Sequence, residues 1–241
     1  MTIEQHVSQE QLVTGLAHRM NNILTLFHGY VGLLLDNSSL DKGTRASLAK
    51  IKDGACAATE LIDRTHSLVR QSKLVERDLD LGQFLSLLRP SLQGLCGPGT
   101  TLTLSTPALP VFRTDAGRLK AALTELVRNA ADATSAGGTV RVEAGFDTAP
   151  GHTRLGGREL IGDAGEWISI SVIDDGHGIE PEVAARMFQP FYSTRKQQQA
   201  TGLGLNVAAE AVQQLGGVLS HSSGDGETRF SILLPVRAGA C

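Results

Sequence analysis

The sequence of 241 residues contains little cysteine and no long apolar run. Its three cysteines, Cys56, Cys96 and Cys241, are odd in number and share no metal-ligand spacing, which argues against a disulfide framework and suits a reducing cytosol. No stretch approaches the roughly 20 apolar residues that span a bilayer, and residues 1–10 are too polar for a secretory signal. We therefore expect a soluble, cytoplasmic protein without a membrane span.

An excess of positive charge is also missing. The chain has 22 Lys and Arg against 25 Asp and Glu, a formal net charge of −3, and it has no long Lys/Arg block. This balance argues against nucleic acid or an anionic membrane as the main partner. The length allows one large domain or two smaller ones.

The sequence pattern changes near residue 77. Before it, two long proline-free stretches flank the turn-rich segment 36–43, which indicates a helical hairpin. Apolar residues in both stretches alternate steps of four and three, a spacing that gives each helix a narrow seam. The seams are Leu16, Met20, Ile23, Phe27, Tyr30 and Leu34, then Leu48, Ile51, Ala55, Ala58, Ile62, Thr65 and Val69. Because such seams scarcely enclose a core alone, we predict a homodimer whose two hairpins form a four-helix bundle.

From residue 78 onward the pattern mixes helices and strands. Asp115 is a good N-cap for a long helix that Gly137 and Gly138 stop. The glycine-rich segment 147–165 lacks periodicity and is expected to be a mobile loop. Other helices are expected at 81–95 and from 202, and strands at 100–105, 139–146, 166–174, 218–222 and 228–235. The predicted fold class is α+β, with a helical hairpin over 1–77 and an α/β sandwich over 78–241.

The run from Ile173 to Ile179 carries the first chemical signal. An apolar strand delivers Asp174 into a turn where Gly176 and Gly178 would let a flat ring approach the backbone. A second glycine pair, Gly202 and Gly204, opens another helix, whose free N–H groups suit phosphate. This arrangement favours a nucleotide pocket.

A polar helix face adds a third feature to the glycine turn and the second glycine pair. Glu125, Asn129 and Asp132 are spaced i, i+4 and i+7, so they share one face of the long central helix. The Asn129 carbonyl is a hard oxygen ligand suited to Mg²⁺, and Arg128 could balance phosphate charge. A merely solvated face is the alternative interpretation.

Taken in order, these segments resemble the boxes that define sensor histidine kinases. Residues 125–133, 174–179, 188–195 and 201–205 are similar to the N, G1, F and G2 boxes, and residues 15–22 look like the H-box. The resemblance covers nearly the whole chain. It implies a dimerisation and histidine-phosphotransfer domain at 1–77 and an ATP-binding catalytic domain, of the superfamily that also holds gyrases and chaperones, at 78–241.

The resemblance implies an ATP- and Mg²⁺-dependent protein-histidine kinase. Its phosphoacceptor would be His18, which would pass the phosphoryl group to an aspartate of a response regulator receiver domain. Asn22 matches the pattern for phosphatase activity on that regulator, Glu125 is a further catalytic candidate, and Asn129 would hold the metal. The implied nucleotide contacts are Arg128, Asn129, Asp132, Asp174, Gly176, Gly178, Ile179, Arg195, Lys196, Thr201, Gly202, Leu203, Gly204, Leu205 and Thr228.

Three positions depart from the family pattern. Arg19 stands where members have an acid after the phosphoacceptor, and an arginine cannot accept a proton. Ile23 replaces a frequent proline, and Ala200 replaces the first glycine of the G2 box. Two alternatives therefore stay open: an ATPase of the same superfamily in which Glu125 activates water, and a degenerate scaffold or phosphatase that docks a receiver domain.

Overall fold

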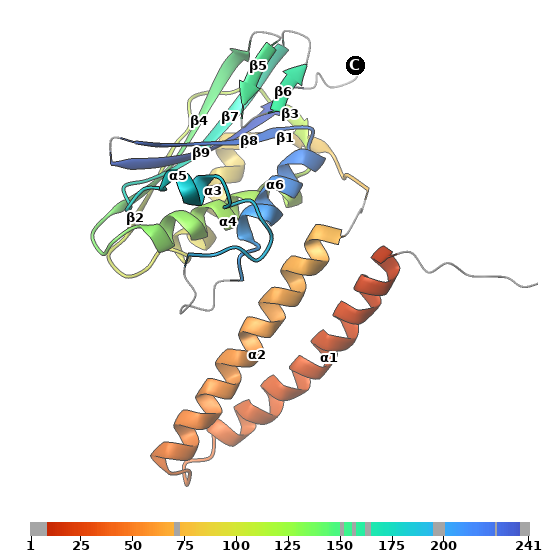
Figure 1. Ribbon diagram of the computed structural model, residues 1–241, viewed down its shortest axis with the longest axis vertical. Coiled ribbons are helices and arrows are strands. Elements are labelled where there is room, and N and C mark those ends of the chain that lie inside the picture. The colour runs from red at the N-terminus through yellow and green to blue at the C-terminus, as the bar shows by residue number, and fades with distance from the viewer. Residues whose placement is uncertain are drawn as a thin grey trace, which may run out of the picture. The chain divides into compact units, whose positions relative to one another are not determined.

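The computed structural model describes residues 9–69, 73–149, 152–155, 158–161, 165–194, 201–224 and 226–236. The chain divides into two compact units, Met1–Ser72 with Ser193–Leu203, and Lys73–Tyr192 with Gly204–Cys241. The first contains a helical hairpin and the second a mixed α/β domain (Figure 1). The predicted fold class, α+β with helices preceding an α/β sandwich, is confirmed.

The hairpin consists of α1 (Gln9–Leu35) and α2 (Lys42–Val69). Asp41 caps α2, because its Oδ1 accepts hydrogen bonds from the amides of Gly43 (2.8 Å) and Thr44 (3.0 Å). Arg45 closes the end of α1 by donating to the Leu35 carbonyl at 2.7 Å, which satisfies a carbonyl that the helix leaves free. Within the described residues, no helix combines the length and apolar character needed to cross a membrane.

The hairpin core uses a face of α1 that differs from its predicted seam. Ala17 and Val31 of α1 are buried, as are Ala55 and Ile62 of α2. The two α2 residues belong to the predicted seam, whereas those of α1 do not. The α1 seam stays 41–67% exposed at Leu16, Met20, Ile23, Phe27, Tyr30 and Leu34. A long apolar stripe on α1 therefore remains uncovered in the single chain.

The second unit is built on a five-stranded sheet in the order β2-β4-β7-β9-β8. β2 and β4 are parallel and the other pairs are antiparallel. Inward side chains of the strands and the apolar faces of three helices form one core. The strands are β2 (Thr101–Ser105), β4 (Thr139–Ala149), β7 (Gly165–Asp174), β8 (Val218–Gly224) and β9 (Glu227–Pro235), and the helices are α3 (Leu81–Gln93), α4 (Ala116–Ala133) and α6 (Gly204–Gln214).

The expectation of a structureless loop over 147–165 is wrong. β4 continues to Ala149, which pairs with Gly165 of β7, and β5 (His152–Leu155) pairs with β6 (Arg158–Ile161). Backbone hydrogen bonds build this extension, so it needs no apolar periodicity that a sequence pattern could reveal. Three short elements were also missed, β1 (Arg77–Leu79), β3 (Phe112–Thr114) and α5 (Pro181–Ala184).

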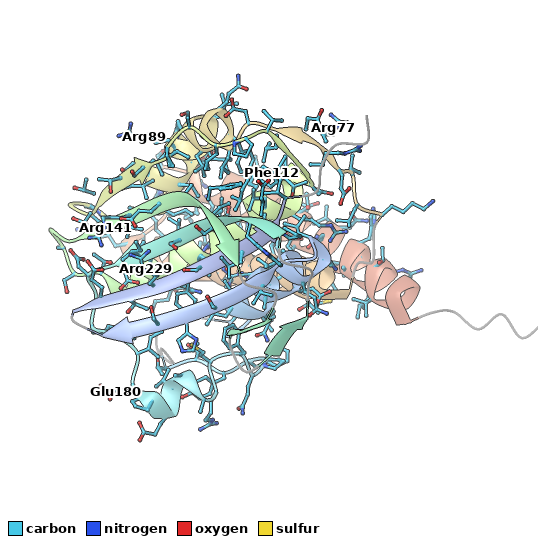
Figure 2. The ribbon with its side chains drawn as sticks, turned by 90° about the horizontal axis from the view of Figure 1, so that it is seen from above. Arg77, Arg89, Phe112, Arg141, Glu180 and Arg229 are labelled. Carbon is cyan, nitrogen blue, oxygen red and sulfur yellow. The ribbon has the colours of Figure 1, made fainter. Side chains whose placement is uncertain are left out.

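Two ion pairs bridge β4 and β9 across the intervening strand β7. Arg141 Nη2 lies 2.6 Å from Glu227 Oε1, and Arg229 Nη1 lies 3.4 Å from Glu143 Oε2. Figure 2 labels the two arginines on the sheet. Both arginines are register partners of Ile173, so the three side chains share one face of the sheet, where Ile173 is fully buried. Each half-exposed pair contributes at most about 1 kcal/mol. Their place in the fold matters more, since they cover the end of β7 that leads into Asp174.

Candidate functional site

The helix that carries the polar face is anchored at its first turn. Asp115 Oδ1 accepts hydrogen bonds from the amides of Gly117 (2.9 Å) and Arg118 (3.1 Å), and Oδ2 accepts from the amide of Val75 (2.9 Å). Partial burial alone would raise the pKa of Asp115, but the three amide hydrogen bonds together outweigh it and lower that pKa. The cap therefore ties the start of α4 to the chain that enters this unit.

The polar face of α4 lies under the first residue of α6. Glu125 is buried, Asn129 and Arg128 are half-buried, and Asp132 is exposed. A Cβ on Gly204 would meet Glu125 Oε2 at 2.7 Å and Asn129 Oδ1 at 3.6 Å. A side chain at position 204 would therefore displace the Glu125 carboxylate. The structure thus brings Gly204 onto the predicted polar face.

Asp174 ends β7 in a buried position. Asp174 is only 3% exposed, and its Oδ1 accepts a hydrogen bond from the Gly176 amide at 3.0 Å. A Cβ on Gly176 would lie 2.5 Å from the Ala133 carbonyl oxygen at the end of α4. Thr228, the register partner of Asp174 on β9, is equally buried. A carboxylate and a hydroxyl therefore flank a backbone that approaches α4 very closely.

Two side chains that were not predicted from the sequence fix the glycine turn over residues 174–179 by hydrogen bonds to backbone amides. Asp175 accepts hydrogen bonds from the Thr139 amide with both carboxylate oxygens, at 3.0 and 2.9 Å. Ser223 Oγ on β8 accepts from the Ile179 amide at 3.0 Å, next to Gly178, whose φ is +77°. Asp175 stands beside Asp174 and could have been suspected. Ser223 carries no sequence signal, because only the pairing of β8 with β9 brings it to the turn.

The segment between Phe188 and α6 carries further expected contacts. Asn206, which was not foreseen, donates to the Phe188 carbonyl at 2.7 Å and so connects the start of this segment to the first turn of α6. Gly202 has a φ of +65°, and Leu203 is buried. Leu205 is half-buried. Thr201 Oγ1 accepts a hydrogen bond from Arg64 Nη1 at 2.7 Å within the first unit. Arg195 and Lys196 lie outside the described residues, as does Ala200.

The expected phosphoacceptor lies on the hairpin. His18 is exposed on α1, and its Nδ1 lies 3.3 Å from Asn22 Nδ2, one helical turn later. Arg19 is exposed as well. The neighbouring Asn21 donates to Asp63 Oδ1 of α2 at 3.1 Å. His18 and Asn22 therefore belong to the first unit, while Asp174 and the polar face of α4 belong to the second.

The donor set of the second unit fits a nucleotide with Mg²⁺. The glycine approaches leave backbone edges where a Cβ would intrude, which suits a flat base and phosphate oxygens. Among the described residues, no group of three His, Cys, Asp or Glu side chains could hold a metal alone. Mg²⁺ commonly binds one or two protein oxygens together with substrate phosphates and water. The Asn129 amide oxygen and the Glu125 carboxylate meet that requirement.

Comparisons with known proteins agree with this geometry. Residues 114–238 match the model of the family described as histidine kinase-, DNA gyrase B-, and HSP90-like ATPase. The chain is 31% identical to the sensor kinase CckA of Brucella abortus over 93% of its own length and 24% of the relative. It is 30% identical to the sensory histidine kinase/phosphatase NtrB of Proteus hauseri over 97% of its length and 64% of the relative. It therefore spans less than two thirds of each of these relatives.

Solved structures share the fold. The crystal structure of full-length ShkA in complex with AMPPNP superposes with a TM-score of 0.68 at 22% identity, covering 97% of this chain and 47% of that one. The Acinetobacter baumannii histidine kinase AdeS gives a TM-score of 0.59 at 17% identity, with 91% and 98% of the two chains covered. These likenesses extend over both the hairpin and the α/β domain.

Proposed function

Because the chain belongs to the family of histidine kinase-, DNA gyrase B-, and HSP90-like ATPases, we propose that it is a sensor histidine kinase core that phosphorylates His18 from ATP. The observation that carries the proposal is the pair of glycine approaches, Gly176 against α4 and Gly204 against Glu125 and Asn129. The relatives named as sensor kinases support it, since their likeness includes the hairpin that bears His18. The proposed domains are a histidine-phosphotransfer domain over residues 1–77 and an ATP-binding domain over residues 78–241.

The proposal gives each predicted nucleotide contact a task. Buried Asp174 accepts a hydrogen bond from the adenine amino group, and Thr228 and Ile179 line the same pocket. Gly204 at the start of α6, and Gly202 before it, would offer backbone amides to phosphate oxygens. Arg128, Asp132, Arg195, Lys196, Thr201, Leu203 and Leu205 complete the proposed nucleotide contacts.

Magnesium is part of the proposal. Asn129 would hold the ion through its amide oxygen, with Glu125 nearby and the remaining ligands supplied by phosphate and water. Bound Mg²⁺ would neutralise charge on the transferred phosphoryl group. Because ATP is the phosphoryl donor, we place the reaction in the cytoplasm.

We also propose that the hairpin dimerises. The uncovered α1 seam holds six apolar residues at alternating spacing, and pairing two hairpins would bury it in a four-helix bundle. Light scattering of the purified chain should give the mass of a dimer. Ile23→Glu, which puts a charge into the seam, should give a monomer, whereas Thr25→Glu, on an exposed polar position of the same helix, should not. A monomeric parent chain would refute the dimer.

The proposed partner is the receiver domain of a response regulator. Phosphohistidine would supply its aspartate, and exposed Asn22 would orient water for hydrolysis of the resulting phosphoaspartate. The name of the NtrB relative carries both kinase and phosphatase activity. One observation favours a second candidate: buried Glu125 beside Gly204 is placed where an ATPase would keep a base for water.

Labelled ATP separates these candidates. The chain is incubated with γ-labelled ATP and Mg²⁺ beside Asn129→Ala, and protein-bound label and free phosphate are measured together. A histidine kinase gives acid-labile label that Asn129→Ala loses. Free phosphate without protein label would instead establish the ATPase. Neither product from the parent chain would leave the scaffold interpretation.

A further inference from the structure

A hydrogen bond joins α2 to a residue that the proposed function assigns to the nucleotide. Arg64 Nη1 donates to Thr201 Oγ1 at 2.7 Å, although 137 positions separate the two residues in the chain. Both side chains are half-buried, and a bond shielded from water is electrostatically stronger than an exposed one. Thr201 belongs to the segment Ser193–Leu203, which forms one compact unit with the hairpin. The bond therefore lies inside the unit that carries His18.

Both ends of this bond lie beside residues that are themselves held in place. On α2, the neighbouring Asp63 accepts a hydrogen bond from Asn21 Nδ2 at 3.1 Å, which ties this level of the helix to α1. On the other side, Gly202 follows Thr201 with a φ of +65°, and the next residue, Leu203, is only 1% exposed. The contact thus joins two supported positions.

The chemistry of the two side chains fixes the direction of the bond. A guanidinium has only N–H donors, so Thr201 Oγ1 must be the acceptor. The hydroxyl has a single proton, and that proton cannot point at the group from which Oγ1 accepts. It is directed away from Arg64, where an anionic oxygen can accept it. The positive charge next to Oγ1 also polarises the hydroxyl, which strengthens the hydrogen bond that it donates.

We propose that Arg64 is a positioning residue for the nucleotide phosphates, because it turns the Thr201 hydroxyl proton toward a phosphate oxygen. This inference rests on the proposed function, which makes Thr201 a nucleotide contact, and it adds a residue of the hairpin that acts through Thr201. Arg64 lies outside every segment that the sequence comparison with the kinase boxes selected. The unit that carries His18 then takes part in holding the nucleotide.

The test measures the affinity of the intact chain for ATP, ADP and adenosine by calorimetric titration with Mg²⁺ present. Thr201→Val removes the hydroxyl and should weaken ATP binding by about tenfold or more, because a hydrogen bond to a charged oxygen is lost. Arg64→Ala leaves the hydroxyl without its orientation and should weaken ATP and ADP binding by roughly two- to tenfold. Adenosine has no phosphate, so all these chains should bind it equally well.

A matched control and a double variant separate this role from a structural one. Lys50→Ala removes a cation from an exposed position about four turns earlier on α2 and should change none of the affinities. If Arg64 acts through Thr201, Arg64→Ala should cost no further ATP affinity in the Thr201→Val chain. Arg64→Gln, which keeps much of the apolar stem, repeats the test if urea unfolding shows that Arg64→Ala is less stable.

The inference is overturned by losses of ATP affinity that add in the double variant, or by equal losses for ATP and adenosine, which mark a structural role. Failure of the proposed kinase gives a different result. Chains that show the expected ATP affinities but take no label from γ-labelled ATP contradict the kinase and support the role of Arg64. Label on His18, together with an Arg64→Ala chain that binds ATP as tightly as the parent, contradicts only the role of Arg64.

Discussion

Gly176→Ala tests whether position 176 needs glycine because the backbone there passes too close to the end of α4 for a side chain, and not because glycine is flexible. The added Cβ would lie 2.5 Å from the Ala133 carbonyl oxygen, 2.8 Å from its carbon and 2.7 Å from Asp174 Oδ1. Two of these neighbours are backbone atoms at the end of α4, which cannot rotate away. Gly176 lacks the positive φ seen at Gly178, so its substitution cost is steric. The turn must move outward, and the Gly176 amide must leave Asp174.

The magnitude follows from two terms. Overpacking of this kind costs about 1–3 kcal/mol of unfolding free energy, and the lost amide hydrogen bond about 0.5–1.5 kcal/mol. Because the displaced backbone is the proposed edge for adenine, ATP affinity should fall by at least about tenfold, equal to roughly 1.4 kcal/mol. Urea unfolding and calorimetric titration with ATP measure the two effects separately.

Two other glycines provide matched controls. A Cβ on Gly224 meets nothing within 4 Å, so Gly224→Ala should leave both stability and ATP affinity nearly unchanged. Gly137 is equally open but has a φ of +94°, so Gly137→Ala should lose about 1–2 kcal/mol of stability through backbone strain. If Gly176→Ala binds ATP as tightly as Gly224→Ala does, the steric account of the pocket is refuted.

Three further changes test the supports of the site. Ser223→Ala removes the acceptor of the Ile179 amide and should weaken ATP binding by roughly two- to tenfold, while the adjacent Ser222→Ala should not, as titration would show. Asp115→Asn should lower stability at pH 6, and the difference should shrink as the pH falls through the lowered pKa of the folded state. Folding lowers the pKa of Asp115, so its contribution is present above the usual value of about 3.9 and is lost as the folded carboxylate protonates. Burial lowers the pKa of His221, so thermal stability should fall as pH drops below about 6.5, and His221→Phe should lose that slope; a slope that persists would contradict the assignment.

Local sequence patterns correctly predicted the helix α4 and the glycine turn after Asp174. Asp115 caps α4 as its residue type and position predicted, and Gly176 stands where the backbone approaches the end of α4. These features depend on neighbours in the sequence or on the special freedom of glycine. A single sequence carries both kinds of information.

Features that depend on distant pairing were not predictable in this way. Ser223 reaches Ile179 only because β8 and β9 pair in one register, and nothing in its own segment announces that role. The exposed seam of α1 is a similar case: periodicity shows that apolar residues share a face, but not which neighbour covers it. The β5–β6 extension was missed because backbone pairing, without an apolar stripe, builds it.

The most direct measurement of the central claim is the location of the phosphoryl group after reaction with ATP. The parent chain and His18→Ala are incubated with γ-labelled ATP and Mg²⁺, and the labelled residue is mapped by mass spectrometry under alkaline conditions. The account expects one phosphohistidine at His18 and no protein label in His18→Ala, with ATP affinity equal in both chains. Label that persists in His18→Ala, or that lies on another residue of the parent chain, would contradict it.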